Sequence, residues 1–189
     1  MNLGKTLYLT NRKEWRSWLA KNYAGEKEIW LIFYRKSSGK PRIPYNDAVE
    51  EALCYGWIDS LQKGIDEEKF AQRFSPRKPT SQLSEMNKER IRRLIRQKKM
   101  TAAGLDAISK IFDISKDREE KTAIAPDILR ALKADNQAWE NFRDFPEGYK
   151  KVRLGFLEGR RRHGDEVFQK SLRHFIRMTA ENKKFGMVK

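Results

Sequence analysis

An unbroken apolar run, Ile29–Tyr34, is the feature that most constrains how this chain of 189 residues folds. Strands with one solvent-facing side alternate apolar and polar residues, whereas an unbroken run is typical of a strand covered on both faces. We therefore predict a central strand over residues 28–36. The run has six residues, too few for a membrane helix, which needs roughly 20. No membrane span is expected.

Two helices are predicted on either side of this strand. Asn11 and Glu14 have the spacing of a capping box, which predicts a helix that extends to about Tyr23. The second helix is predicted over residues 44–55, because proline suits a first helical turn and Gly56 suits a helix end.

A hairpin is predicted next, with arms over residues 57–65 and 69–75. The turn is centred near Asp66. Strand pairing around that centre would place Asp59 opposite Arg73, on neighbouring strands of the sheet. Opposite charges in such positions attract each other, so the two residues are expected to form a pair.

The remainder of the chain is predicted to be helical, because apolar residues recur at helical spacing, as in Phe168, Leu172 and Phe175. A charged stretch without apolar period, residues 117–125, indicates a linker that ends at Pro126. The predicted helices cover residues 87–99, 101–114, 127–134, 136–144, 146–158 and 165–182.

Strands early and helices late are typical of an α+β fold. We expect a small antiparallel sheet with flanking helices in residues 1–120. A helical C-terminal module is expected in residues 121–189.

The charge is strongly positive and unevenly spread. The chain has 41 Lys and Arg against 26 Asp and Glu, a net charge of +15. Residues 87–99 carry a net +6 and residues 149–189 a net +8, whereas residues 44–68 carry −6. This asymmetry predicts a surface that attracts polyanions, unless the basic helices only present a solvated outer face. The candidate polyanion-binding residues are Arg90, Arg92, Arg93, Arg96, Arg160, Arg161 and Arg162.

Signatures of metal binding and covalent catalysis are few, since the chain has two histidines and one cysteine. His163 is expected in an exposed basic turn, His174 in a structural role on an amphipathic helix, and Cys54 in the core. We predict no metal site and no cofactor. A single cysteine excludes an intramolecular disulfide framework, which favours a cytoplasmic location.

One region is dense in chemically distinctive residues. Asp59 and Arg73, with Trp57 and Phe74 as walls, would line a cleft for a small ligand. The alternative is structural, with the charged pair stabilising the hairpin and Trp57 in the core. The candidate ligand-binding residues are Trp57, Asp59, Arg73, Phe74, Arg77, Ser84 and Asn87.

Three motifs in this region carry a family resemblance. Residues 56–60 are Gly-Trp-Ile-Asp-Ser, residues 73–79 are Arg-Phe-Ser-Pro-Arg-Lys-Pro, and residues 81–88 follow the pattern Ser-x-x-Ser-x-x-Asn-Lys. In order and spacing they resemble the YdeI/OmpD-associated family, and Met-Thr-Ala-Ala-Gly at residues 100–104 fits its next motif. The C-terminal part is similar to the helical OmpD-associated (OmdA-type) module.

The resemblance implies an N-terminal domain of the YjbR/CyaY-like class and a link to envelope stress or bacteriocin protection, but no reaction. One departure lies at residues 81–84, where Ser-Gln-Leu-Ser replaces the usual Ser-x-Trp-Ser and removes an aromatic face. We expect a cytoplasmic protein that binds a protein or a small molecule. The alternatives are a nucleic-acid-binding protein without sequence preference, acting through the basic helices, and an enzyme with a site near Asp59 and Arg73.

Overall fold

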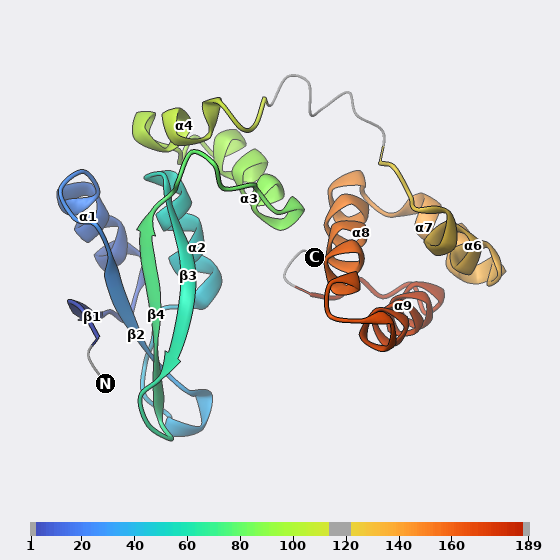
Figure 1. The fold of residues 1–189 in the computed structure, drawn as a ribbon, viewed down its shortest axis with the longest axis horizontal. Helices are drawn as coiled ribbons and strands as arrows, with labels where there is room; N and C mark the ends of the chain where they lie inside the picture. The colour runs from blue at the N-terminus through green and yellow to red at the C-terminus, as the bar shows by residue number, and fades with distance from the viewer. Residues whose placement is uncertain (1–2, 114–121, 187–189) are drawn as a thin grey trace. The chain divides into compact units, whose positions relative to one another are not determined.

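The computed structural model describes residues 3–113 and 122–186 (Figure 1). The chain divides into two compact units. Unit 1 comprises Met1–Gln82 and Arg90–Asp113, and unit 2 comprises Leu83–Glu89 and Ile114–Lys189.

The helix α3 (Glu85–Arg96) therefore begins in unit 2 and ends in unit 1. A division at residue 120 stays a prediction. The predicted linker, residues 117–125, falls largely outside the described residues.

Unit 1 contains a four-stranded sheet of order β1-β2-β4-β3. β2 has neighbours on both sides and is mostly buried, as its unbroken apolar run predicts. The α+β prediction is confirmed, although the sheet is mixed, because the short first strand runs parallel to β2. The strands are β1 (Thr6–Tyr8), β2 (Ile29–Tyr34), β3 (Trp57–Gly64) and β4 (Lys69–Pro76).

Both α1 (Arg12–Asn22) and α2 (Tyr45–Cys54) pack on one face of this sheet. From α1, the Trp15 ring meets Phe74 of β4 at a centroid distance of 5.5 Å. From α2, the Tyr45 ring lies 6.1 Å from Phe33 of β2. Phe33 and Phe74 belong to the same face, so this face holds the core of unit 1.

The predicted cap of α1 is confirmed. The Asn11 side chain accepts a hydrogen bond from the N–H of Glu14 at 3.1 Å. The Glu14 carboxylate accepts in turn from the N–H of Thr10 at 3.2 Å. The first bond satisfies a backbone donor that the first helical turn leaves unpaired, and the second ties the residue before the N-cap to the helix.

The junction between α2 and β3 explains two of the sequence motifs. Gly56 has a φ of +75°, a left-handed conformation that favours glycine. The hydroxyl of Thr101 donates to the carbonyl of Cys54 at 2.6 Å and so holds α4 (Ala102–Ser109) against the end of α2. A side chain at Gly104 would collide with this carbonyl, because a Cβ there would lie 2.2 Å from it.

Cys54 is fully buried, as the sequence predicts, and burial raises the pKa of its thiol to about 11. We expect Cys54 to resist thiol reagents at pH 8 in the folded protein. An unfolded thiol has a pKa near 8.5, so roughly a quarter is thiolate at this pH, against roughly 0.1% in the fold. The rate of a colorimetric thiol assay with and without urea checks this. Complete labelling within minutes in native buffer would contradict it.

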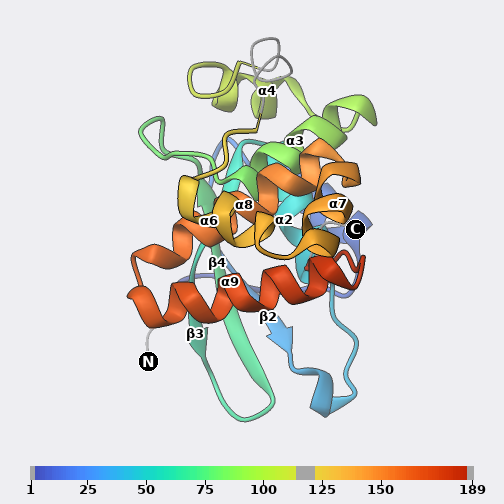
Figure 2. The same cartoon turned by 90° about the vertical axis from the view of Figure 1, so that its right-hand side faces the viewer.

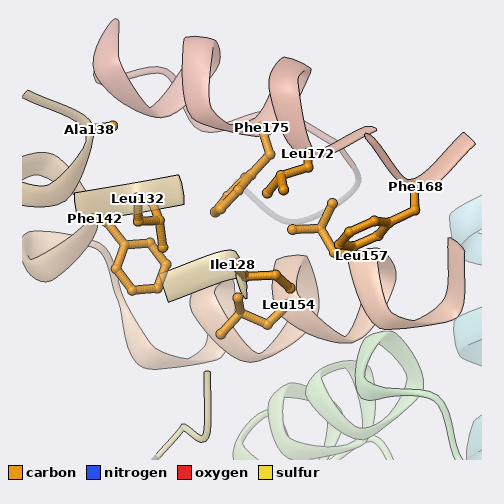
Figure 3. Packing of buried hydrophobic residues seen from close by; sticks show 9 residues of the cluster. All are labelled: Ile128, Leu132, Ala138, Phe142, Leu154, Leu157, Phe168, Leu172 and Phe175. Atoms are coloured by element: carbon orange, nitrogen blue, oxygen red, sulfur yellow. The ribbon is translucent and has the colours of Figure 1, made fainter. Parts of the chain in front are cut away.

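Unit 2 is helical around a separate core (Figure 3). Phe168, Leu172 and Phe175 face this core, as their helical spacing predicts, and meet Leu157 of α8 and Phe142 of α7. Figure 2 shows α9 along its full length. The helices described after residue 121 are α6 (Pro126–Lys133), α7 (Asn136–Asp144), α8 (Glu147–Arg161) and α9 (Asp165–Ala180).

Candidate functional site

The predicted pairing of Asp59 with Arg73 is wrong. Asp59 lies opposite Phe74 of β4, and Arg73 pairs with Trp30 of β2. Because successive side chains of a strand point to opposite faces, Asp59 and Arg73 lie on different faces of the sheet. The hairpin is centred one residue later than the predicted Asp66, because Gly64 pairs with Phe70. An irregularity between Asp59 and Gln62 then shifts the register by one residue, which leaves Asp59 opposite Phe74.

Each of the two charges has another partner. The Nη2 atom of Arg73 lies 2.6 Å from the Glu28 carboxylate. Asp59 accepts a short hydrogen bond from the hydroxyl of Tyr45. Burial, together with this bond, raises the pKa of Tyr45 above its ordinary value. The two residues therefore do not form the shared cleft on which the predicted ligand site, and the enzyme alternative, depended.

We expect Asp59→Asn and Arg73→Gln to act additively on the free energy of unfolding. Residues that share no partner couple by less than about 0.5 kcal/mol. Tyr45→Phe combined with Asp59→Asn is the matched control, and this hydrogen-bonded pair should couple by about 0.5–3 kcal/mol. Urea unfolding of both double-mutant cycles measures this. A coupling above about 1 kcal/mol between Asp59 and Arg73 would refute the placement on opposite faces.

Trp57 and Phe74 belong to the core. Trp57 is 1% exposed and Phe74 is 0% exposed. The indole N–H of Trp57 donates to the carbonyl of Tyr23 at 3.1 Å, and its ring meets Trp18 edge-on at 5.9 Å. The structural interpretation of these two residues therefore agrees with their surroundings.

The remaining predicted ligand residues organise loops. Arg77 donates to the carbonyls of Ser81 and Gln82 at 2.7 and 2.6 Å. Ser84 accepts from the N–H of Asn87 at 3.3 Å, in the first turn of α3. Arg77 belongs to unit 1, whereas Ser84 and Asn87 belong to unit 2.

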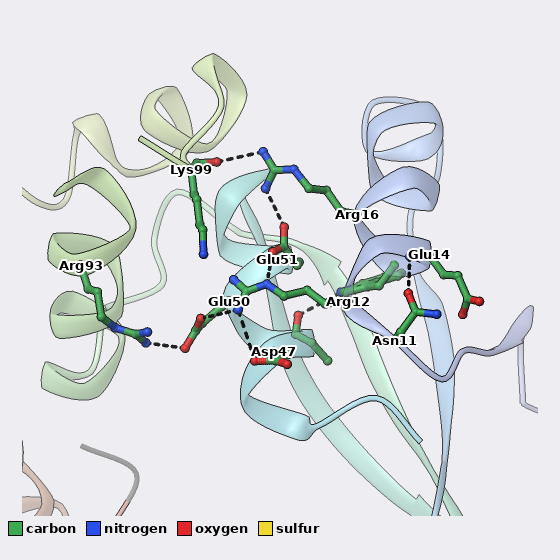
Figure 4. A network of polar contacts seen from close by, with 11 residues as sticks. Asn11, Arg12, Glu14, Arg16, Asp47, Glu50, Glu51, Arg93 and Lys99 are labelled. Atoms are coloured by element: carbon green, nitrogen blue, oxygen red, sulfur yellow. Dashed lines mark hydrogen bonds and ion pairs between the residues drawn. The ribbon is translucent and has the colours of Figure 1, made fainter. Parts of the chain in front are cut away.

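Arg93, one of the predicted polyanion-binding residues, takes part in a buried ion-pair network (Figure 4). Its centre is formed by Glu50 and Glu51 of α2, whose side chains are 5% and 3% exposed. The guanidinium of Arg12 lies 3.1 Å from Glu50, that of Arg16 lies 2.6 Å from Glu51, and Arg93 pairs with Glu50. The network joins α1 and α2 to the part of α3 that belongs to unit 1.

The other predicted cations of α3 differ in exposure. Arg90 is 7% exposed and donates to the side chain of Asn46 at 2.6 Å. The half-buried Arg92 lies over the Phe112 ring, with Cζ 5.7 Å from its centroid. Of the four predicted arginines on α3, Arg96 alone is exposed. Three of these four arginines therefore have contacts with other side chains of unit 1.

The arginine run at the end of α8 is partly neutralised. Arg161 pairs with Glu158 at 2.8 Å and with Asp127 at 2.9 Å. These pairs raise the pKa of Arg161 above its ordinary value, the hydrogen bond to Glu158 first. Arg160 is half-buried, and Arg162 is exposed.

A stripe of exposed positive charge lies on α9. Its members share one face of the helix, since they are spaced by three, four and seven residues. All are exposed, and together they line a surface pocket. We call this surface the α9 stripe, and it consists of Lys170, Arg173, His174 and Arg177.

The cations of the α9 stripe form no ion pair with any described residue. In the part of the chain that the structure describes, Lys170 and Arg173 form no hydrogen bond and no ion pair. Arg177 contacts the His174 ring at 3.3 Å. No acidic residue lies between Glu166 and Glu181 in the sequence. The opposite side of α9 packs in the core of unit 2, so the α9 stripe faces away from that core.

The α9 stripe affects the pKa of Glu181, the acidic residue that follows α9. The pKa of Glu181 is lowered, first by a hydrogen bond from Lys183 and further by the charges of Arg177 and His174.

Comparison with known proteins gives a family. A family model described as a domain of unknown function (DUF8412) matches residues 7–107, more than half of the chain. The chain belongs to the DUF8412 family. The DUF8412 match includes nearly all of the sheet, the Glu50–Glu51 network and most of α4, whereas the α9 stripe lies outside it. No curated protein and no solved structure matches the chain. The resemblance to YdeI/OmpD-associated proteins stays a prediction.

Within residues 3–113 and 122–186, no group of three or more His, Cys, Asp or Glu side chains is arranged to hold a metal ion. No helix in these ranges combines the length and the apolar character that crossing a membrane demands.

Sequence reasoning missed the α9 stripe as a surface. The residues of the stripe lie in the basic segment 149–189, but the three adjacent arginines at 160–162 are a more obvious cluster of charge in that segment. The signal was present in the spacing, because Lys170, Arg173 and Arg177 alternate with the apolar residues that face the core.

Proposed function

We propose that this protein binds nucleic acid without sequence preference through the α9 stripe. The proposal is supported above all by three exposed Lys and Arg side chains, on one fixed helix face, that form no ion pair among the described residues. Contacts from Lys and Arg to phosphates give affinity that does not depend on sequence. The net charge of +15 adds long-range attraction for any polyanion.

The dimensions of the stripe suit a nucleic-acid backbone. From Lys170 to Arg177 the helix rises by about 10 Å, at 1.5 Å per residue. Each strand of B-form DNA presents one phosphate per about 3.4 Å of axis, so about three phosphates lie within this length. Lys170, Arg173 and Arg177 provide one cation for each of them.

The cellular role that we propose comes from the resemblance to the YdeI/OmpD-associated family. A binding protein of this type would act in the cytoplasm, in envelope stress or bacteriocin protection, with a protein or small molecule as a further partner. The buried Cys54 is compatible with a reducing compartment, where thiols stay unpaired.

Neutralising the stripe tests the proposal. The variant Lys170→Gln/Arg173→Gln/Arg177→Gln should lose about 100-fold or more in affinity for a random-sequence 20-base-pair duplex at 0.1 M salt. The slope of log K against log salt should also become shallower by about 2.7, since each lost phosphate contact removes about 0.9. Fluorescence anisotropy with a labelled duplex measures both quantities.

The matched control removes three charges from exposed residues of unit 1. Lys13, Lys21 and Lys27 are exposed and form no ion pair among the described residues. Lys13→Gln/Lys21→Gln/Lys27→Gln should lose less than about tenfold, because only long-range attraction is reduced. Equal losses in the two triple variants would show that net charge alone binds the duplex, and would refute the assignment to α9.

A further inference from the structure

Arg153 of α8 is buried without a counter-ion. It is 7% exposed, and its Nε atom has no hydrogen-bond partner. Throughout residues 3–113 and 122–186, nothing forms a hydrogen bond or an ion pair with this guanidinium. Burial holds the pKa of Arg153 below its ordinary value, yet arginine keeps its charge in proteins. Buried charges are normally paired, so this position is costly for the free protein.

Two other buried cations have acceptors, although the Nε atom of Arg77 lacks one. Arg77, at 9% exposure, donates to two backbone carbonyls. Lys150, at 8% exposure, donates to the carbonyl of Arg143 at 2.7 Å and to the carboxylate of Glu147 at 2.8 Å. Arg153 lacks such acceptors, which distinguishes it from a structural arginine.

Aromatic rings flank the guanidinium. The Cζ atom of Arg153 lies 3.9 Å from the centroid of the Phe185 ring and 4.8 Å from that of Phe156. Stacking on the rings leaves the N–H groups in the guanidinium plane for an acceptor. Phe156 is 43% exposed, an unusual state for a phenylalanine.

Arg153 and Phe156 line a pocket of about 280 Å³ within unit 2. This volume is just below the range of about 300–1,000 Å³ that is usual for small-molecule sites. Apolar side chains such as Met86 form much of the wall. Gly155 allows close approach of the helices, since a Cβ there would lie 2.8 Å from the side chain of Glu85.

The remaining wall of the pocket is the start of α3. Ser84 and Met86 line the pocket at this end. The first turn of a helix presents N–H groups without intrahelical partners and carries partial positive charge, which favours a bound anion. Glu85 also lines the pocket, and its carboxylate accepts a hydrogen bond from Lys88 at 2.6 Å.

We propose that this pocket binds a small organic carboxylate with an aromatic body. The carboxylate would accept in-plane hydrogen bonds from Arg153, and the ring would pack on Phe156 and Met86. One guanidinium balances one negative charge, whereas a doubly charged phosphate would bring a second charge into a largely apolar site. The site belongs to unit 2 and does not depend on nucleic-acid binding by the α9 stripe.

Calorimetric titration with 3-phenylpropionate tests the proposal. The wild type should bind it, and Arg153→Met should weaken binding at least tenfold. The same substitution at an exposed arginine of α6, Arg130→Met, should leave the affinity unchanged. The neutral amide of the same acid should bind at least tenfold more weakly than the acid. The midpoint of thermal unfolding should not fall in Arg153→Met, because methionine removes an uncompensated buried charge.

Several results would overturn the proposal. The first two are that the wild type does not bind 3-phenylpropionate at millimolar concentration, or that it binds the amide as tightly as the acid. The other two are that it binds phenyl phosphate more tightly than the acid, or that Arg153→Met keeps full affinity for the acid. NMR of the wild type keeps the test independent of any variant that fails to fold. The acid should shift the resonances of Phe156 and Met86, and shifts confined to other residues would refute the site.

Discussion

Replacing Trp57 by alanine should lower the free energy of unfolding by about 3–5 kcal/mol. Trp57 is 1% exposed, packs against Trp18 and donates its indole N–H to the carbonyl of Tyr23. The substitution removes the packing and leaves both a cavity and an unpaired carbonyl. A domain is stable by only about 5–15 kcal/mol, so this loss should be visible as a large drop in the midpoint of urea unfolding.

The same strand offers a matched control. Leu61 of β3 is 56% exposed, and Leu61→Ala should change the free energy of unfolding by less than about 0.5 kcal/mol. Circular dichroism during urea unfolding compares the two variants. Equal, small effects would mean that Trp57 is not part of the core.

The second large effect is expected in the buried ion-pair network. Glu51→Gln should destabilise the protein by about 2–3 kcal/mol. Breaking a buried pair costs about 3–5 kcal/mol, but Arg12 and Arg16 are 27% and 37% exposed and partly screened by solvent. The amide cannot balance the two guanidinium groups that the carboxylate holds.

A surface ion pair gives the comparison. Glu68 is 55% exposed and pairs with Lys40 at 2.7 Å, so Glu68→Gln should cost no more than about 1 kcal/mol. Both variants keep the shape of the side chain and remove one charge. If Glu51→Gln is no more costly than Glu68→Gln, the network contributes nothing beyond an exposed pair.

Sequence patterns predicted most of the elements because the patterns are local. The run at Ile29–Tyr34 predicted a central strand, and Asn11 with Glu14 predicted the start of α1. The strand β1 was missed, because three residues are too few for a period to show. The register of the hairpin was wrong because the turn is centred one residue later than Asp66, with Gly64 opposite Phe70, and because an irregularity between Asp59 and Gln62 shifts the pairing again.

The candidate sites were harder to predict, because burial is decided by tertiary packing. Arg90 and Arg93 belong to the most basic segment of the chain, yet one is buried and the other pairs with Glu50. Arg173 stands in a less conspicuous stretch and is exposed without a partner among the described residues. Arg153 is one of three arginines in the basic helix α8, and only the structure shows that it is buried.

The central claim is that the α9 stripe makes the protein bind nucleic acid through phosphate contacts. The most direct measurement is the affinity of the intact protein for a random-sequence 20-base-pair duplex between about 50 and 200 mM salt. Three contacts predict that log K falls with log salt with a slope of about −2.7 or steeper, and that duplexes of unrelated sequence bind alike. Undetectable binding at about 50 mM salt, or a slope near zero, would contradict the account.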